Sequence, residues 1–79
     1  MTNVIKKQVF NSIAKILDKK LDHISEDQSF TEDLECDSLD LVELVMELEK
    51  KFEIEISDTS LAKFKTLRDI IEYISRKVL

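Results

Sequence analysis

The sequence contains neither glycine nor proline at any of its 79 positions. Sheets whose strands are joined by tight turns need glycine or an Asn-Gly pair at the corners, because those turns require positive backbone φ angles. The chain therefore favours helices, and we expect an all-α fold. A chain of this length is also expected to form one domain, spanning residues 1–79.

The stretch from Asp37 to Phe52 is predicted to be an amphipathic helix. Asp37 is suited to cap it, and Asp40 lies three residues later, as in a capping box. At about 100° per residue, one arc about 100° wide gathers five apolar side chains that suit a core: Leu41, Leu44, Val45, Leu48 and Phe52. Three more apolar side chains fall on the opposite face among acids: Leu39, Val42 and Met46. A complete core face makes that second set unnecessary, so we interpret the outer face as a docking surface with Ser38 at its head.

The remaining chain predicts two more long helices and one short one. Residues 3 to about 19 carry apolar side chains at helical spacing: Val4 or Ile5, Val9, Ile13, Ile16 and Leu17. The last helix is expected to be capped by Thr66 with Asp69 at its third position. Its core stripe is Leu67, Ile70, Ile71, Ile74 and Val78. Ser57 or Asp58 is expected to cap a short helix that ends near Phe64.

A long polar connection, residues 21–36, joins the first two long helices. Leu21, Ile24 and Phe30 are expected to anchor it in the core. The predicted architecture is therefore a small four-helix bundle with three longer helices, one short helix and a long loop between the first two.

Charge is distributed unevenly along the chain. Residues 21–58 hold 14 acidic side chains against two lysines, whereas the segments on either side are basic, and the net charge is −5. A field of one sign attracts oppositely charged partners and repels polyanions, so basic proteins are expected partners and nucleic acid is not. No apolar run approaches the roughly 18 residues that cross a bilayer, so no membrane span is predicted.

No residue pattern indicates catalysis or metal binding. Ser38 has no candidate base nearby, because His23 is 15 residues away and the neighbouring side chains are carboxylates. His23 is the only histidine, which excludes a zinc site of known spacing. Cys36 is the only cysteine; it is either a small apolar loop residue or a thiol activated by the nearby helix N-terminus, which would let it form an intermolecular disulfide. A lone cysteine suggests a reducing, intracellular setting.

The motif Asp37-Ser38-Leu39 is followed by Val-Glu-Leu-Val-Met at 42–46 and by Phe-Glu-Ile-Glu-Ile at 52–56. Together with the acidic helix, these residues resemble the acyl carrier protein family over nearly the whole chain. In that family the motif serine carries 4′-phosphopantetheine through a phosphodiester, which implies Ser38 as the attachment site here. The resemblance implies a cytoplasmic, non-catalytic carrier of growing acyl chains, held as thioesters on that arm, for fatty acid biosynthesis.

The resemblance also implies partners and departures from the usual pattern. The partners are a phosphopantetheinyl transferase and fatty acid synthesis enzymes with basic docking patches, namely ketosynthases, reductases, dehydratases and acyltransferases, which meet a monomeric carrier. The implied docking residues are Asp37, Leu39, Asp40, Glu43, Met46 and Ile56. Glu35 and Cys36 stand where the family usually has small residues, and a left-handed backbone at position 35 would cost about 1–2 kcal/mol for glutamate. Lys50 and Lys51 replace acids that commonly extend the docking stripe, and Ser57 replaces a common proline.

Two alternatives remain open from the sequence. One is a carrier for polyketide, nonribosomal peptide or D-alanine transfer, which would share the serine and differ in the docking face. The other is an unmodified acidic helical adaptor in which Ser38 is only a helix cap. The mass of the protein from its host separates the adaptor from the carriers.

Overall fold

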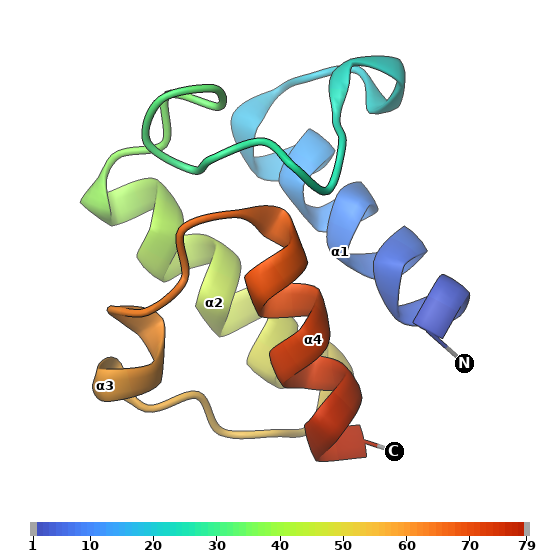
Figure 1. Cartoon of the computed structure of the whole chain (residues 1–79), viewed down its shortest axis with the longest axis vertical. Helices are drawn as coiled ribbons and strands as arrows, with labels where there is room; N and C mark the ends of the chain where they lie inside the picture. The colour runs from blue at the N-terminus through green and yellow to red at the C-terminus, as the bar shows by residue number, and fades with distance from the viewer. Residues whose placement is uncertain (1, 79) are drawn as a thin grey trace.

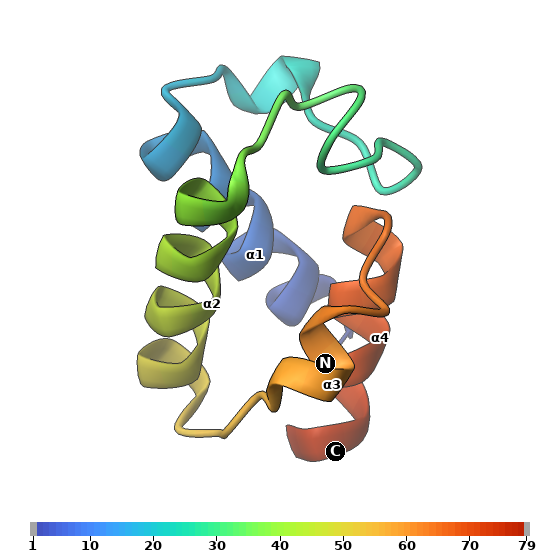
Figure 2. The ribbon, with the colours of Figure 1, turned by 90° about the vertical axis from the view of Figure 1, so that its left-hand side faces the viewer.

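The computed structural model describes residues 2–78, which form four α-helices and one 3₁₀ turn (Figure 1). The elements are α1 (Thr2–Leu17), η1 (Leu21–His23), α2 (Ser38–Phe52), α3 (Asp58–Leu61) and α4 (Leu67–Val78). The predicted all-α fold with three longer helices, one short helix and a long first loop is confirmed. α1 packs against both α2 and α4. Figure 2 shows α1 and α3 on opposite sides of the α2 and α4 pair.

Every long helix and the first loop contribute to one core. Its buried side chains are Ile5, Val9, Ile13, Ile24, Phe30, Leu34, Cys36, Leu44, Val45, Leu48, Ile56, Leu67, Ile70, Ile71 and Ile74. The predicted core stripe of α2 is therefore confirmed at its centre, with Leu41 and Phe52 partly buried at its ends. The predicted stripe of α4 is confirmed except at Val78, which is exposed.

Leu21 was expected to anchor the first loop in the core, and that expectation is wrong. Its side chain is 50% exposed, because η1 lies just beyond the end of α1 and has no buried residue. The other two expected anchors, Ile24 and Phe30, are buried. The loop is therefore fixed to the bundle from Ile24 onward.

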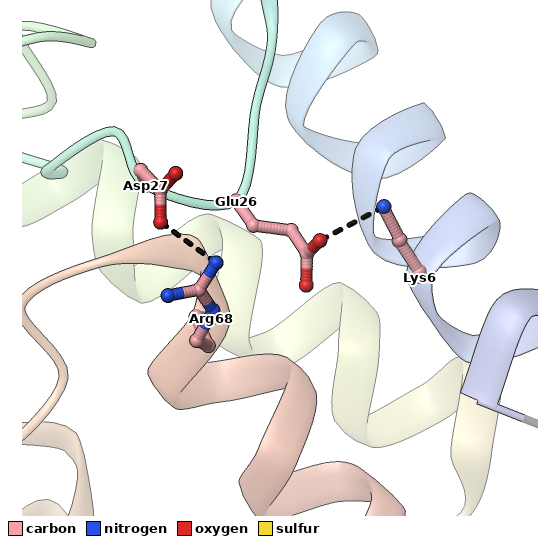
Figure 3. Close-up of polar contacts among 4 residues, drawn as sticks. All are labelled: Lys6, Glu26, Asp27 and Arg68. Atoms are coloured by element: carbon pink, nitrogen blue, oxygen red, sulfur yellow. Dashed lines mark hydrogen bonds and ion pairs between the residues drawn. The ribbon is translucent and has the colours of Figure 1, made fainter.

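The middle of this loop is joined to the start of α4 by backbone hydrogen bonds. The Phe30 N–H donates to the Lys65 carbonyl (3.0 Å), and the Arg68 N–H donates to the Glu26 carbonyl (3.0 Å). Two ion pairs reinforce this junction, which we call the loop clamp (Figure 3): Lys6 Nζ to Glu26 Oε2 at 2.9 Å, and Arg68 to Asp27 Oδ1 at 2.7 Å. The hydrogen bond from Lys6 lowers the pKa of the Glu26 carboxyl. The loop clamp thus ties α1, the loop and α4 together.

The connection from α2 to α3 depends on Glu49. Its backbone carbonyl accepts the N–H groups of Glu53 and Ile54, which ends α2 with Glu53 in a left-handed conformation (φ 56°). The Glu49 carboxylate then accepts the Ile56 N–H at 2.8 Å. Ser57 caps α3, as predicted, but α3 ends at Leu61, and only residues 62 and 63 continue it, as a turn.

Candidate functional site

Ser38 is the first residue of α2 and its side chain is exposed. The capping box predicted around it is present. Asp37 Oδ1 accepts the Asp40 N–H at 2.9 Å, and Asp40 Oδ2 accepts the Asp37 N–H at 3.4 Å. These two reciprocal hydrogen bonds fix the start of the helix. Ser38 is therefore held on a rigid helix end and open to solvent.

The loop before Ser38 is held by its own hydrogen bonds. The Ser29 hydroxyl accepts the N–H groups of Glu32 and Asp33, and the Asp33 carboxylate accepts the Ser29 N–H at 2.7 Å. The Cys36 N–H donates to the Phe30 carbonyl at 2.7 Å. Since Phe30 is buried and bonded to Lys65, this chain of contacts connects the loop clamp to the start of α2.

The two residues before Asp37 behave differently from each other. Glu35 has φ 52°, so this position does adopt the left-handed backbone, and glutamate occupies it. Cys36 is buried, and burial, with the nearby charges of Asp40 and Asp37, raises the pKa of its thiol to about 11. An activated thiol would need the opposite shift. Cys36 is therefore a small core residue, and burial disfavours a disulfide-linked dimer.

The outer face of α2 is as exposed as its pattern suggests. Leu39 is 79% exposed and Met46 is 60% exposed, with Val42 and Glu43 also exposed between them. Asp37 is exposed and Asp40 is half-buried. Ile56 differs from the other expected docking residues, since only 8% of it is accessible and it belongs to the core.

The inner edge of α2 carries a polar contact with α1 that the sequence did not reveal. Lys15 pairs with Glu47 at 3.0 Å, and Lys51 Nζ donates to the buried hydroxyl of Ser12 at 3.0 Å. The hydrogen bond from Lys15 lowers the pKa of the Glu47 carboxyl. These partners are more than 30 residues apart in sequence, and no local pattern links them.

Within 2–78, no three His, Cys, Asp or Glu side chains are grouped to hold a metal ion. No helix in that range has both the length and the apolarity to cross a membrane. The arrangement therefore supports an exposed acceptor hydroxyl at the head of a partly apolar, acidic helix face, and this is the class of site that covalently tethered carriers use.

The comparison with protein families identifies that class. Residues 7–74 match the family described as "Phosphopantetheine attachment site". The chain is 44% identical over 75 residues to the acyl carrier protein of Buchnera aphidicola subsp. Schizaphis graminum, covering 95% of both chains. It is 46% identical over 70 residues to the acyl carrier protein of Exiguobacterium sibiricum, covering 89% of both.

Solved structures agree with these relatives. A structure from Anaplasma phagocytophilum, titled as an acyl carrier protein, superposes with a TM-score of 0.86 at 37% identity, covering 95% of this chain and 89% of that one. Another from Mycobacterium tuberculosis, titled likewise, gives a TM-score of 0.84 at 31% identity, covering 92% and 97%. The chain belongs to the acyl carrier protein family. It is a non-catalytic carrier with a phosphopantetheine attachment site, and membership implies a phosphopantetheinyl transferase and acyl-handling enzymes as its partners.

Proposed function

We propose that Ser38 is the attachment residue for 4′-phosphopantetheine and that the chain carries growing acyl groups in fatty acid biosynthesis. The observation that carries the proposal is the place of Ser38. It is an exposed hydroxyl at the first position of α2, in the middle of the region that matches the family. An acceptor needs accessibility and no base of its own, because the modifying enzyme supplies the base.

The surroundings of Ser38 fit a phosphodiester. The first N–H groups of a helix have no partner within it, and the helix dipole favours negative charge at that end. The Asp37 and Asp40 carboxylates oppose this effect, although each accepts a backbone N–H that offsets part of its charge. When attached, the arm supplies a terminal thiol that holds acyl groups as thioesters. A flexible covalent tether raises the effective concentration of its cargo at each docked enzyme.

The proposed docking surface is the start and outer face of α2. Asp37, Leu39, Asp40, Glu43 and Met46 supply acidic and apolar contacts for a basic docking patch. Ile56 takes part only where a partner reaches the open groove beside α2 that it helps to line. The buried position of Ile56 makes it the weakest member of this set.

The names of the relatives support the setting. Several are called acyl carrier proteins at 41–46% identity, which favours the fatty-acid type over carriers for polyketide, nonribosomal peptide or D-alanine transfer. In this proposal residues 1–79 act as one monomeric carrier domain in the cytoplasm. The acidic middle of the chain favours basic protein partners over nucleic acid.

Modification of Ser38 is tested by intact mass. The apo-protein is incubated with a broad-specificity phosphopantetheinyl transferase, coenzyme A and magnesium, and one phosphopantetheinyl adduct is expected. Ser38→Ala should abolish the adduct. Ser57→Ala is the matched control, because Ser57 is also exposed at a helix start and should leave the adduct in place. An adduct that survives Ser38→Ala, or none on the unaltered chain, overturns the assignment.

The pathway is tested on protein purified from its host. Thioester-bound acyl groups that differ by two-carbon units are expected for fatty acid synthesis. An aminoacyl group would favour the other carrier types. An unmodified mass, with no adduct in the transferase reaction, would favour the helical adaptor.

A further inference from the structure

One lysine interrupts the exposed stripe of α2. At about 100° per residue, Leu39, Glu43, Met46 and Lys50 fall within about 60° of one another on the helix. This face also borders an open groove, which is lined by Glu43, Met46 and Lys50 of α2 and by Tyr73 and Lys77 of α4. Read from the N-terminal end, this stripe therefore runs apolar, acidic, apolar and basic.

Several charged groups near the stripe already have partners inside the molecule, whereas Glu55 and Asp58, which line the same groove, belong to no ion pair within 4 Å among the described residues. Glu47 pairs with Lys15, and the Glu49 carboxylate accepts the Ile56 N–H. Lys51 donates to Ser12, and Lys77 Nζ lies 5.6 Å from the centre of the Tyr73 ring. These contacts fix the charges in place and reduce what they can offer a docking protein.

Glu43 and Lys50 are the exceptions on the stripe. Both side chains are exposed, and among residues 2–78 neither belongs to an ion pair within 4 Å. Two acids lie three residues from Lys50, but neither pairs with it: Glu47 is bound to Lys15, and Glu53 lies beyond the end of α2 in a left-handed conformation. Lys50 follows Glu43 by seven positions, which corresponds to a rise of about 10 Å along the helix. Two opposite charges are thus presented about 10 Å apart, with the exposed Met46 between them.

We infer that the enzymes that dock on this carrier have a docking patch of mixed charge. The patch carries a cation opposite Glu43, an apolar side chain over Met46, and a carboxylate opposite Lys50. This inference rests on the proposed function, because it assumes that acyl-handling enzymes dock on α2. The argument is charge complementarity: a uniformly basic patch would place a like charge against Lys50, and that repulsion would slow association.

The order of charges also fixes the orientation of the complex. A partner rotated by 180° on the stripe would put its cation against Lys50 and its carboxylate against Glu43. Juxtaposed like charges disfavour that arrangement. Lys50 therefore serves as a specificity residue that selects one of the two orientations of the partner along α2.

The inference is tested with the phosphopantetheine-bearing carrier and the ketosynthase of the same host, by the kcat/KM of acyl transfer at low ionic strength. Lys50→Glu is expected to lower kcat/KM by about three- to tenfold, chiefly through KM. The matched control is Lys7→Glu, which makes the same change of net charge at an exposed position on α1 and should leave kcat/KM within about twofold. The effect of Lys50→Glu should disappear at high salt, because exposed charges are screened.

The sign of the effect decides between the two kinds of patch. If Lys50→Glu raises kcat/KM, the patch is uniformly basic and the inference is wrong. An effect equal to that of Lys7→Glu would also overturn it, since net charge would then explain the result. Failure of the proposed function looks different: Ser38 would not be modified, and no variant would transfer acyl groups. Circular dichroism melts of both variants verify that folding is unchanged.

Discussion

The loop clamp and the outer face of α2 use the same kinds of residue in opposite ways. At the loop clamp, Glu26 and Asp27 pair with Lys6 and Arg68, and backbone hydrogen bonds run alongside (Figure 3). On the outer face of α2, Glu43 and Lys50 are left open to solvent beside exposed apolar side chains. The loop clamp uses its polar groups in internal contacts, whereas the outer face of α2 leaves them exposed, as the proposed docking surface requires.

The contrast between paired and exposed charges suggests that different regions of this small domain serve stability and the proposed docking. A chain of this size buries only about 60% of its unfolded surface, so its loop must be held by polar contacts as well as by a few anchors. The acidic middle of the chain supplies both regions. Surroundings decide which acids are paired internally: Glu26 and Asp27 lie in the loop beside Lys6 and Arg68, whereas Glu43 lies on the outer face of α2. Three experiments break or sharpen this comparison.

The largest change in the free energy of unfolding is expected for a substitution within α2. Leu48 is fully buried, so Leu48→Ala should lower the free energy of unfolding by about 2–5 kcal/mol. Met46→Ala, two residues away on the outer face, should change it by no more than about 0.5 kcal/mol. Urea denaturation followed by circular dichroism measures both. Equal losses would mean that the outer face also stabilises the fold, and the division between the two faces would fail.

Much of this helix could be predicted because its information is local. The capping box is set by the spacing of Asp37 and Asp40, and the core stripe by the helical period. Leu21 shows where periodicity fails, since it lies in a loop whose path depends on η1 and on contacts far along the chain. The loop clamp itself joins residues from 20 to about 40 positions apart and has no sequence signature.

A second experiment weakens the contact between the Asp69 side chain and the backbone just before α4, next to the loop clamp. The Asp69 carboxylate accepts the N–H groups of Lys65 (2.9 Å) and Thr66 (3.1 Å), and these bonds lower its pKa. Because the folded pKa lies below the unfolded value of 3.8, the stabilisation is present above about pH 4. It is lost as pH falls through the folded pKa.

Asp69→Asn should therefore cost about 1–2 kcal/mol of unfolding free energy at pH 7. The difference from the unaltered protein should shrink as the pH falls below about 4. Asp27→Asn is the control, because its pair with Arg68 is solvent-exposed and should contribute about 0.5 kcal/mol or less. Urea titrations at several pH values measure both. A cost for Asp69→Asn that does not depend on pH would show that the carboxylate charge is unimportant there.

The start of α2 could be predicted from a motif, whereas the docking surface stays a prediction. The place of Ser38 follows from Asp37-Ser38-Leu39 and the helix that begins there. The resemblance implies Ile56 as a docking residue, yet Ile56 is buried, and the Glu49 carboxylate accepts its backbone N–H. That contact crosses a helix end, where periodicity carries no information. Glu49 is accordingly a residue that the sequence pattern did not single out.

The smallest change in the free energy of unfolding is expected for a substitution of Glu35, at the end of the loop before α2. Its φ of 52° costs a non-glycine residue about 1–2 kcal/mol, and glycine would recover this at the expense of about 0.5–1 kcal/mol of chain entropy. Glu35→Gly should therefore stabilise the protein by about 0.5–1 kcal/mol. Glu32→Gly, in the same loop without a positive φ, should destabilise it by a similar amount. If urea denaturation shows that both variants are destabilised, contacts of the Glu35 side chain outweigh its backbone strain. Internal stabilising contacts would then extend from the loop clamp to the start of α2.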